Sequence, residues 1–223
     1  MSMTLYDLCG ADQSKRFSPT CWRAKMALSH KGVAFSTVAT PFTKIREIDG
    51  GNAKTVPYLV DGDARITDSF DIAVYLDKKY PDGPALFDGP GDIATAKFIR
   101  AWANTSLNPI IVGLVVKNIH DVLAEPDQKY FRETREKALK ARLEDVQTGR
   151  EEKLEAFTKA LTPLRTMLAE QPFIGGNAPR FADYIVFGSL KWLMSFADFD
   201  VLKSDDAVLA WFNAIDATYT GGN

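Results

Sequence analysis

The chain has 223 residues, of which 46% are hydrophobic and 25% charged, and its 27 basic and 29 acidic side chains leave a net charge of −2. These values allow one large domain or two smaller ones, and the mixed charges argue against a nucleic-acid partner. The longest apolar stretch, residues 110–116, contains Gly113 and is too short to cross a bilayer, so we expect no membrane partner.

Cysteine and histidine content and the N-terminal residues favour a cytoplasmic protein. Cys9 and Cys21 are too few for a disulfide framework or a cysteine-rich metal site, and His30 and His120 lack a metal-binding spacing. The N-terminal residues carry no basic region followed by an apolar core, which a signal peptide requires. We therefore expect a reducing cytoplasm and no bound metal.

The first predicted elements are a strand, a helix and a strand. Residues 4–9 alternate in the manner of a short strand, and residues 19–31 have a helical pattern closed by Gly32. Residues 33–38 predict a second strand. Because a single helix connects the two strands, we expect them to be parallel, with a right-handed crossover.

A broken region at residues 40–54 separates this unit from a hairpin. Residues 56–66 carry Asp-Gly at a central position, which favours a tight turn between two antiparallel strands. Asp68 and Ser69 then precede a helix with a broad apolar face that ends near Tyr80. The predicted order is β-α-β-α-β-β-α, with a proline opening the third strand.

Ser18 stands at the start of the first predicted helix. Proline is favoured as a first helical residue, which makes Ser18 the natural N-cap before Pro19, accepting from the amide of Thr20 or Cys21. A hydroxyl can cap a helix and still donate its proton to a ligand, and an anion is stabilised at this end of the helix dipole. Ser18 is therefore either a cap alone or a cap that also holds a thiolate.

Three short motifs follow one another along this unit: Ser18-Pro19 with Trp22-Arg23, the Val56-Pro57 pair, and Asp68-Ser69. Their order and spacing resemble the thioredoxin-like half of a cytosolic glutathione transferase. The resemblance implies an α/β thioredoxin-like domain at residues 1–81, a linker at 82–92 and an all-α helical-bundle domain at 93–223. It also implies glutathione as a co-substrate.

The same resemblance implies specific glutathione-binding roles. Ser18 would be the catalytic residue that holds the thiolate, while Pro57 would be cis and Val56 would pair through its backbone with the cysteinyl part. Asp68 would face the γ-glutamyl ammonium. Ser69 and the first amides of its helix would take the neighbouring carboxylate, because a helix N-terminus binds anions.

The glycyl carboxylate of glutathione would need a cation. Lys44 is the candidate that we select, with Arg46 and Lys54 as alternatives from the same region. Each of the three can equally be a solvated surface cation, which is the usual state of such side chains.

Cys21 lies three residues after Ser18, at a helix start, where a redox-active cysteine could stand. The glutathione-disulfide branches of the family carry their cysteine at the position of Ser18. We favour Cys21 as a small buried hydrophobe over Cys21 as the nucleophile of a thiol-disulfide reductase.

The second half contains helical patterns and no predicted strand. A Pro- and Gly-rich connector leads into one long pattern at residues 93–118, which Pro109 should kink near residues 106–108. Further helical patterns cover residues 130–146, 154–168, 181–196 and 205–217.

Residues 173–183 resemble the family's signature around a buried N-capping box. Asp183 is structural in this interpretation and reaches back to a backbone amide. Arg180 stands where the family has Ser or Thr, and because its side chain cannot accept an amide proton, the cap should be weakened.

The acceptor pocket should lie between Ser18 and the long helix at residues 93–118. Its candidate lining residues are Tyr6, Trp102, Ser106 and Ile110.

Five segments resemble the bacterial β-etherases and their fungal FuA-class relatives: residues 18–23, 80–82, 86–90, 145–151 and 181–184. In that branch the glutathione sulfur attacks a carbon beside a carbonyl and displaces a phenoxide from a β-aryl ether. The resemblance implies a homodimeric transferase acting on a small, electrophilic, aromatic molecule. A glutathione-dependent reductase and a non-catalytic glutathione- or ligand-binding protein remain alternatives.

Overall fold

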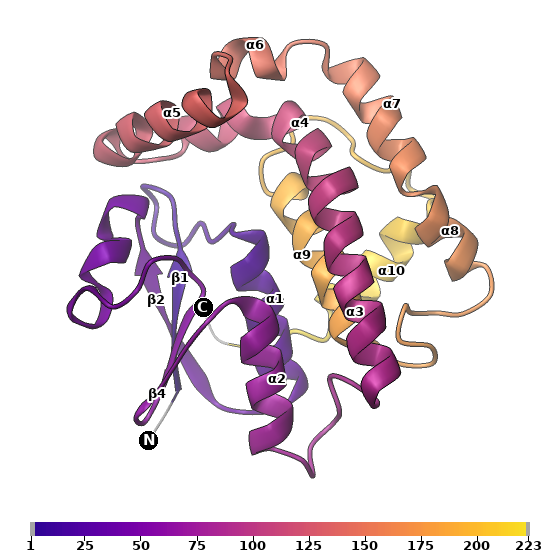
Figure 1. Cartoon of the computed structure of the whole chain (residues 1–223). Coiled ribbons are helices and arrows are strands. Elements are labelled where there is room, and N and C mark those ends of the chain that lie inside the picture. Colours follow the sequence, from indigo (N-terminus) through magenta and orange to yellow (C-terminus); the bar gives the residue numbers. More distant parts are fainter. Residues whose placement is uncertain (1–2, 222–223) are drawn as a thin grey trace.

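The computed structural model describes residues 3–221, so residues 1–2 and 222–223 of the two expected domains lie outside the described residues. Its first part contains a sheet with flanking helices (Figure 1). In chain order the elements are β1 (Met3–Leu8), α1 (Pro19–His30), β2 (Phe35–Thr40), η1 (Phe42–Gly51), β3 (Tyr58–Asp61), β4 (Ala64–Thr67) and α2 (Ser69–Lys79).

The four strands form one mixed sheet in the order β2-β1-β3-β4. β1 and β2 are parallel and joined by α1, as predicted, while β3 is antiparallel to both β1 and β4. The hairpin turn contains Gly62 with φ +58°, a conformation that favours glycine. This arrangement is the expected thioredoxin-like fold.

The second part consists of helices joined by loops, and none of the helices within residues 3–221 is long and apolar enough to cross a membrane. The elements are α3 (Pro90–Trp102), η2 (Ala103–Leu107), α4 (Asn108–Asp121), α5 (Glu125–Leu139), α6 (Leu143–Gln147), α7 (Arg150–Ala160), α8 (Thr162–Leu168), α9 (Phe181–Met194) and α10 (Ala207–Asp216).

Prolines and left-handed residues divide this part more finely than the sequence pattern suggests. The expected kink near Pro109 is confirmed, because the π-helical turn η2 separates α3 from α4. The pattern at residues 154–168 contains two helices rather than one, since Pro163 stands in the first turn of α8. Lys140, with φ +56°, likewise ends α5 before α6 begins.

The second predicted helix of the first part is η1, a 3-10 segment rather than an α-helix. Asp49 and Gly50 interrupt it with φ values of 50° and 66°, which a continuous helix does not allow. The buried carboxylate of Asp127 on α5 accepts from the first two amides of η1 at 3.0 and 2.9 Å. The helical half therefore fixes the position of η1.

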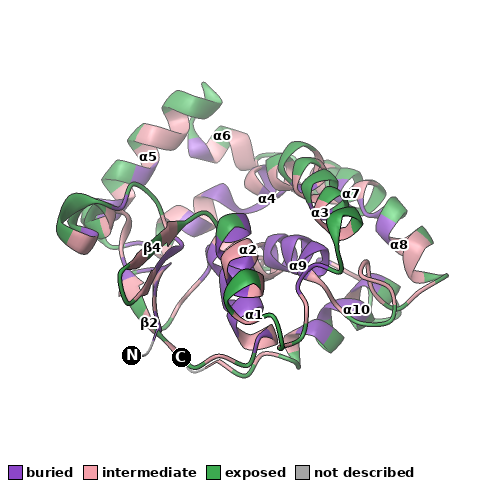
Figure 2. Ribbon diagram, turned by 60° about the horizontal axis from the view of Figure 1, so that its bottom comes forward, coloured by how far each residue is buried: buried purple, intermediate pink, exposed green. Residues whose placement is uncertain are grey.

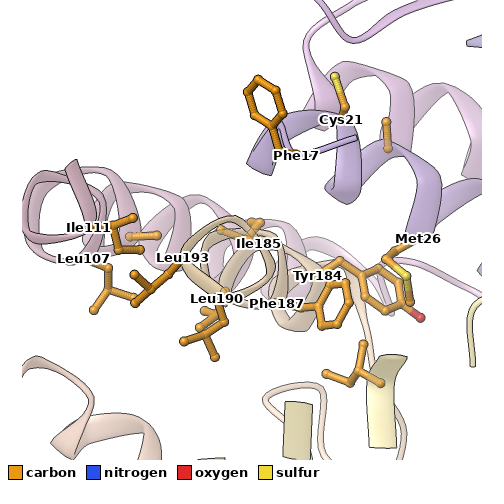
Figure 3. Packing of buried hydrophobic residues seen from close by; sticks show 14 of the residues in the cluster. Phe17, Cys21, Met26, Leu107, Ile111, Tyr184, Ile185, Phe187, Leu190 and Leu193 are labelled. Carbon is orange, nitrogen blue, oxygen red and sulfur yellow. The ribbon is translucent and has the colours of Figure 1, made fainter. Parts of the chain in front are cut away.

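Helix α9 lies at the centre of the molecule and is buried along most of its length (Figure 2). It packs along α1, and Gly188 permits this contact because a Cβ there would lie 2.4 Å from the carbonyl oxygen of Pro19. Phe187 of α9 packs edge-on against Trp22 of α1 with ring centroids 6.3 Å apart, and Leu190 and Leu193 continue the buried core along α9 (Figure 3). The first turn of α1 thus rests on the most buried helix.

His30, the last residue of α1, links the two halves. Its Nε2 donates to the carbonyl oxygen of Ala85 at 3.0 Å, and its Nδ1 lies 2.7 Å from the hydroxyl of Tyr184. Burial lowers the pKa of His30, so the folded protein favours the neutral ring.

We predict that stability falls on acidification through this histidine. Its folded pKa lies below its unfolded one, so its contribution is present above about pH 6.5 and is lost as pH falls through the folded pKa. The free energy of unfolding, measured by urea titration, should fall by at most about 1.4 kcal/mol per pH unit from this proton. His30→Gln should reduce this dependence of the unfolding free energy on pH, and the control His120→Gln should leave it unchanged. An unchanged slope in His30→Gln would contradict the prediction.

Candidate active site

Ser18 caps the start of α1 as the sequence predicts. Its Oγ accepts from the amide of Cys21 at 3.3 Å, and Thr20 Oγ1 lies 3.0 Å away. Only 5% of Ser18 is exposed. Because the Oγ accepts the capping bond, its own proton can be donated, either to Thr20 Oγ1 or to an anionic acceptor beyond the helix end.

Ser18 lines a cavity of about 450 Å³ to which both halves of the molecule contribute. Lys54 and Thr55, just before β3, add polar groups. Arg135 of α5 adds a guanidinium. The remaining lining residues are apolar or aromatic: Leu8, Phe17, Pro19, Phe42, Ile45, Val56, Val112, Val116, Ile119, Tyr130, Phe131 and Trp192.

Val56 lines the same cavity, and the Val56-Pro57 peptide bond is cis, as the resemblance implies. Within residues 3–221, neither the amide nor the carbonyl of Val56 takes part in a backbone hydrogen bond. β3 itself is paired on both sides, by β1 and β4, so an extended peptide could pair with the backbone only here, before the strand begins.

Asp68 and Ser69 form the N-terminus of α2, outside the lining of this cavity. Asp68 has φ 71°, which is uncommon for a residue other than glycine, and its carboxylate accepts from the amide of Phe70 at 2.7 Å. Burial lowers the pKa of the Arg23 guanidinium on α1 to about 10, and the nearby charge of Asp68 acts in the opposite direction. The start of α2 therefore lies close to α1.

Of the three candidate cations, only Lys54 lines the cavity with Ser18. Lys44 lies on η1, lines a different surface hollow and forms an exposed ion pair with Glu47 at 2.7 Å. Arg46 is exposed on η1 and does not line the cavity either. The spacing in the sequence could not distinguish these residues. The irregular path of η1 places Lys44 and Arg46 outside the cavity, and that path has no signal in the spacing.

The four candidate acceptor residues do not line the cavity beside Ser18. Tyr6 packs edge-on against Tyr58 with ring centroids 6.1 Å apart, and Trp102 lines a separate apolar hollow with Phe98. Ser106 lies in η2, and Ile110 lies in α4 next to the buried Ile111. The long helix does reach the cavity, but through Val112, Val116 and Ile119, nearly three turns further on than the expected Trp102, Ser106 and Ile110.

Sequence reasoning did not identify the aromatic residues that line the cavity, which are Phe17, Phe42, Tyr130, Phe131 and Trp192. Phe42 of η1 lies between Phe17, at 6.4 Å between ring centroids, and Phe131, at 5.6 Å. Phe17, immediately before Ser18, was visible in the motif, but nothing local indicates that residues 42 and 131 meet it.

Both cysteines are buried and therefore unsuited to redox chemistry. Cys21 is 0% exposed, and burial raises its pKa well above the usual range (Figure 3). Burial also raises the pKa of Cys9 to about 11. A thiolate nucleophile needs a low pKa and access to its partner, so Cys21 does not support a thiol-disulfide reductase.

Asp183 lies away from the cavity and holds the segment before α9. Its carboxylate accepts from the amides of Ile174, Gly175 and Arg180 at 2.7, 2.9 and 2.9 Å, and from the indole Nε1 of Trp211 at 3.0 Å. Burial raises its pKa, although each of these donors acts in the opposite direction. The contact to Arg180 is the back-bond expected from the capping box.

No cluster of His, Cys, Asp and Glu within residues 3–221 could hold a metal ion.

Both halves of the chain match family models. Residues 14–85 match the glutathione S-transferase N-terminal domain, and residues 94–216 match the glutathione S-transferase C-terminal domain. Among curated proteins, glutathione S-transferase Z1 of Arabidopsis thaliana is 42% identical over 69 residues, 29% of this chain and 31% of that protein. A zeta-class glutathione S-transferase of Euphorbia esula is 34% identical over 122 residues, 51% of this chain and 52% of that protein. The chain thus matches between about a third and a half of these relatives' lengths.

Two solved structures share the fold over the whole chain. Glutathione transferase GSTFuA3 from Phanerochaete chrysosporium has a TM-score of 0.88 at 23% identity, covering 100% of this chain and 99% of its own. The glutathione S-transferase CsGST63524 of Ceriporiopsis subvermispora, solved in complex with glutathione, has a TM-score of 0.85 at 22% identity and covers 100% of both chains.

Proposed function

Because the chain belongs to the glutathione S-transferase family, we propose that it binds glutathione beside Ser18 and transfers its thiolate to an aromatic electrophile. The observation that carries the proposal is the shared cavity. It brings together the hydroxyl at the start of α1, the unpaired backbone of Val56 and a largely apolar wall.

The proposed contacts follow the chemistry of the tripeptide. The cysteinyl backbone pairs with Val56 next to Pro57, and the thiolate accepts a hydrogen bond from Ser18. The γ-glutamyl carboxylate accepts hydrogen bonds from Ser69 and from the first amides of α2, and Asp68 faces the γ-glutamyl ammonium. Lys54 replaces Lys44 as the cation for the glycyl carboxylate, because it lines the cavity and Lys44 does not.

Ionising the thiol is the step that the protein must assist. A thiol with an ordinary pKa near 8.5 is mostly neutral at pH 7, and lowering its pKa by two units takes about 2.7 kcal/mol. A hydroxyl hydrogen bond to charged sulfur contributes about 1.5–3 kcal/mol. The helix N-terminus adds about 0.3–1 kcal/mol, so the two together are sufficient.

Aromatic electrophiles fit the cavity, and a β-aryl ether beside a carbonyl is the substrate we propose within that class. The sulfur would form a bond to the carbon next to the carbonyl, the carbon–oxygen bond would break, and the phenoxide would leave with its electron pair and take a proton from solvent. The fold shared with fungal FuA transferases supports this choice. We further propose a cytoplasmic homodimer.

Turnover of two substrates tests the reaction. The protein is incubated with glutathione and either a β-aryl ether ketone, monitored by phenol release, or 1-chloro-2,4-dinitrobenzene. Ether cleavage would support the specific proposal, and conjugation of the halide alone would leave a general transferase. Glutathione binding by calorimetry without turnover of any electrophile would instead identify a non-catalytic binding protein.

Replacing Lys54 should weaken glutathione binding selectively. Because the side chain is exposed, we expect Lys54→Met to raise the KM for glutathione by up to about fivefold, with little change in kcat. Lys44→Met removes an equal charge from the exposed pair with Glu47 and should leave KM unchanged. Steady-state kinetics at varied glutathione concentration measure both KM values. A rise in KM in Lys44→Met but not in Lys54→Met would contradict the assignment.

A further inference from the structure

Arg135 is a half-buried cation on the wall of the cavity that Ser18 lines. Its guanidinium carbon lies 4.9 Å from the ring centroid of Phe131 and 5.6 Å from that of Phe42. Burial lowers the pKa of Arg135, as expected where water is partly excluded from a charge. The side chain therefore brings a positive charge into a mainly apolar and aromatic site.

No carboxylate within the described part of the chain forms an ion pair with this guanidinium. Among the described residues, the Arg135 guanidinium has no carboxylate within 4.0 Å, and its Nη1 donates to Thr134 Oγ1 at 3.1 Å. Tyr130, which also lines the cavity, is a further polar neighbour. By contrast, Arg132, one turn earlier on α5, forms ion pairs with Glu136 at 2.7 Å and Glu144 at 2.9 Å.

The aromatic rings compensate for part of the lost hydration, since a guanidinium over an aromatic face is attractive. Apart from the bond to Thr134, no described side chain accepts from its five N–H donors, and the guanidinium lines the cavity. A planar guanidinium binds a carboxylate with two parallel hydrogen bonds. A ligand that brings an anionic oxygen into this cavity would give the guanidinium a charged acceptor.

We propose that Arg135 selects acceptor substrates that carry a carboxylate on the aromatic ring. This inference rests on the proposed function and names its substrate class: aromatic electrophiles with an anionic oxygen remote from the reacting carbon. The thiolate near Ser18 attacks that carbon while the carboxylate binds Arg135, and Phe42 and Phe131 flank the ring. Arg135 is thus a specificity residue that does not take part in bond making.

Two matched electrophiles test the proposal: 4-(chloromethyl)benzoate and its methyl ester. Both react by the same step, in which sulfur bonds to the benzylic carbon and chloride leaves with the electron pair of the broken bond. We measure kcat/KM for each at saturating glutathione. The ratio of the two values is then compared between variants, so that their intrinsic reactivities cancel.

We expect Arg135→Met to lower the benzoate-to-ester ratio by about tenfold or more, because a hydrogen-bonded charge pair is lost. Methionine keeps an apolar stem against the rings, and Arg135→Lys should retain part of the preference. Lys137→Met, which removes an exposed charge from the same helix, should leave the ratio unchanged. An equal fall for both substrates in Arg135→Met would show a packing role and overturn the proposal.

The KM for glutathione shows whether Arg135 acts on the acceptor substrate or on glutathione. A rise in the KM for glutathione in Arg135→Met, alike with both electrophiles, would assign the guanidinium to the tripeptide and overturn the proposal. If the wild-type protein turns over neither electrophile, the proposed reaction fails, but the inference remains testable by calorimetry. S-(4-carboxybenzyl)glutathione should then bind more tightly than its methyl ester, and Arg135→Met should abolish the difference. Equal binding of both conjugates by the wild-type protein would refute the role of Arg135.

Discussion

Ser18→Ala is expected to lower the rate of glutathione conjugation about 10- to 30-fold near pH 7, because the thiol would lose the hydrogen bond that favours its ionised form. Binding of glutathione should change little, since the backbone of Val56 and the start of α2 are intact. Raising the pH ionises the thiol without assistance, so the rates of the two proteins should converge above about pH 9. Single-turnover kinetics and the ultraviolet absorbance of the bound thiolate, each against pH, measure the effect.

The alanine variant also loses the N-cap of α1, which costs about 1 kcal/mol of stability. Ser18→Asp separates the two roles, because a carboxylate still accepts from the amide of Cys21 but repels a thiolate. We therefore expect Ser18→Asp to keep the thermal stability of the wild-type protein and to be less active than Ser18→Ala. Full turnover by the alanine variant between about pH 6 and 8 would show that Ser18 is only a cap.

Asp183→Ala should have the largest effect on stability. The substitution leaves three backbone amides and the indole N–H of Trp211 without their acceptor, around a side chain that is 0% exposed. Buried donors without a partner cost about 1–3 kcal/mol each, so partial relaxation still leaves a loss of about 3–5 kcal/mol. Urea unfolding monitored by tryptophan fluorescence measures this difference.

Asp183→Asn has nearly the same shape but presents an NH₂ group to one or more of these donors, so we expect an intermediate loss. Asp205→Ala, at an exposed position before α10, should change the unfolding free energy by no more than about 0.5 kcal/mol. A loss at Asp183→Ala no larger than that of Asp205→Ala would contradict the structural role.

Several features of the fold could be predicted because they depend on residues close in the chain. The cap at Ser18 needs only a hydroxyl before a proline and a helical pattern, and the hairpin needs only Asp-Gly between two strand patterns. The kink before Pro109 follows from a missing amide. Finer breaks, such as the left-handed Lys140, carry no such local signal.

The cavity could not be predicted in the same way. Phe42 and Arg135 are separated by a long stretch of chain and meet because Asp127 ties η1 to α5. The choice between Lys44 and Lys54 depends on the irregular path of η1. Which turns of the long helix face the cavity depends on how α4 packs after η2.

The sequence by itself therefore determined the family, the order of the main elements and the helix start that carries Ser18, since each depends on short motifs and on the period of apolar residues. Only the tertiary structure decided which side chains surround that start. A residue's local pattern shows that its side chain turns inward, but the packing of α4, α5 and η1 against one another determines which inward side chains share a cavity.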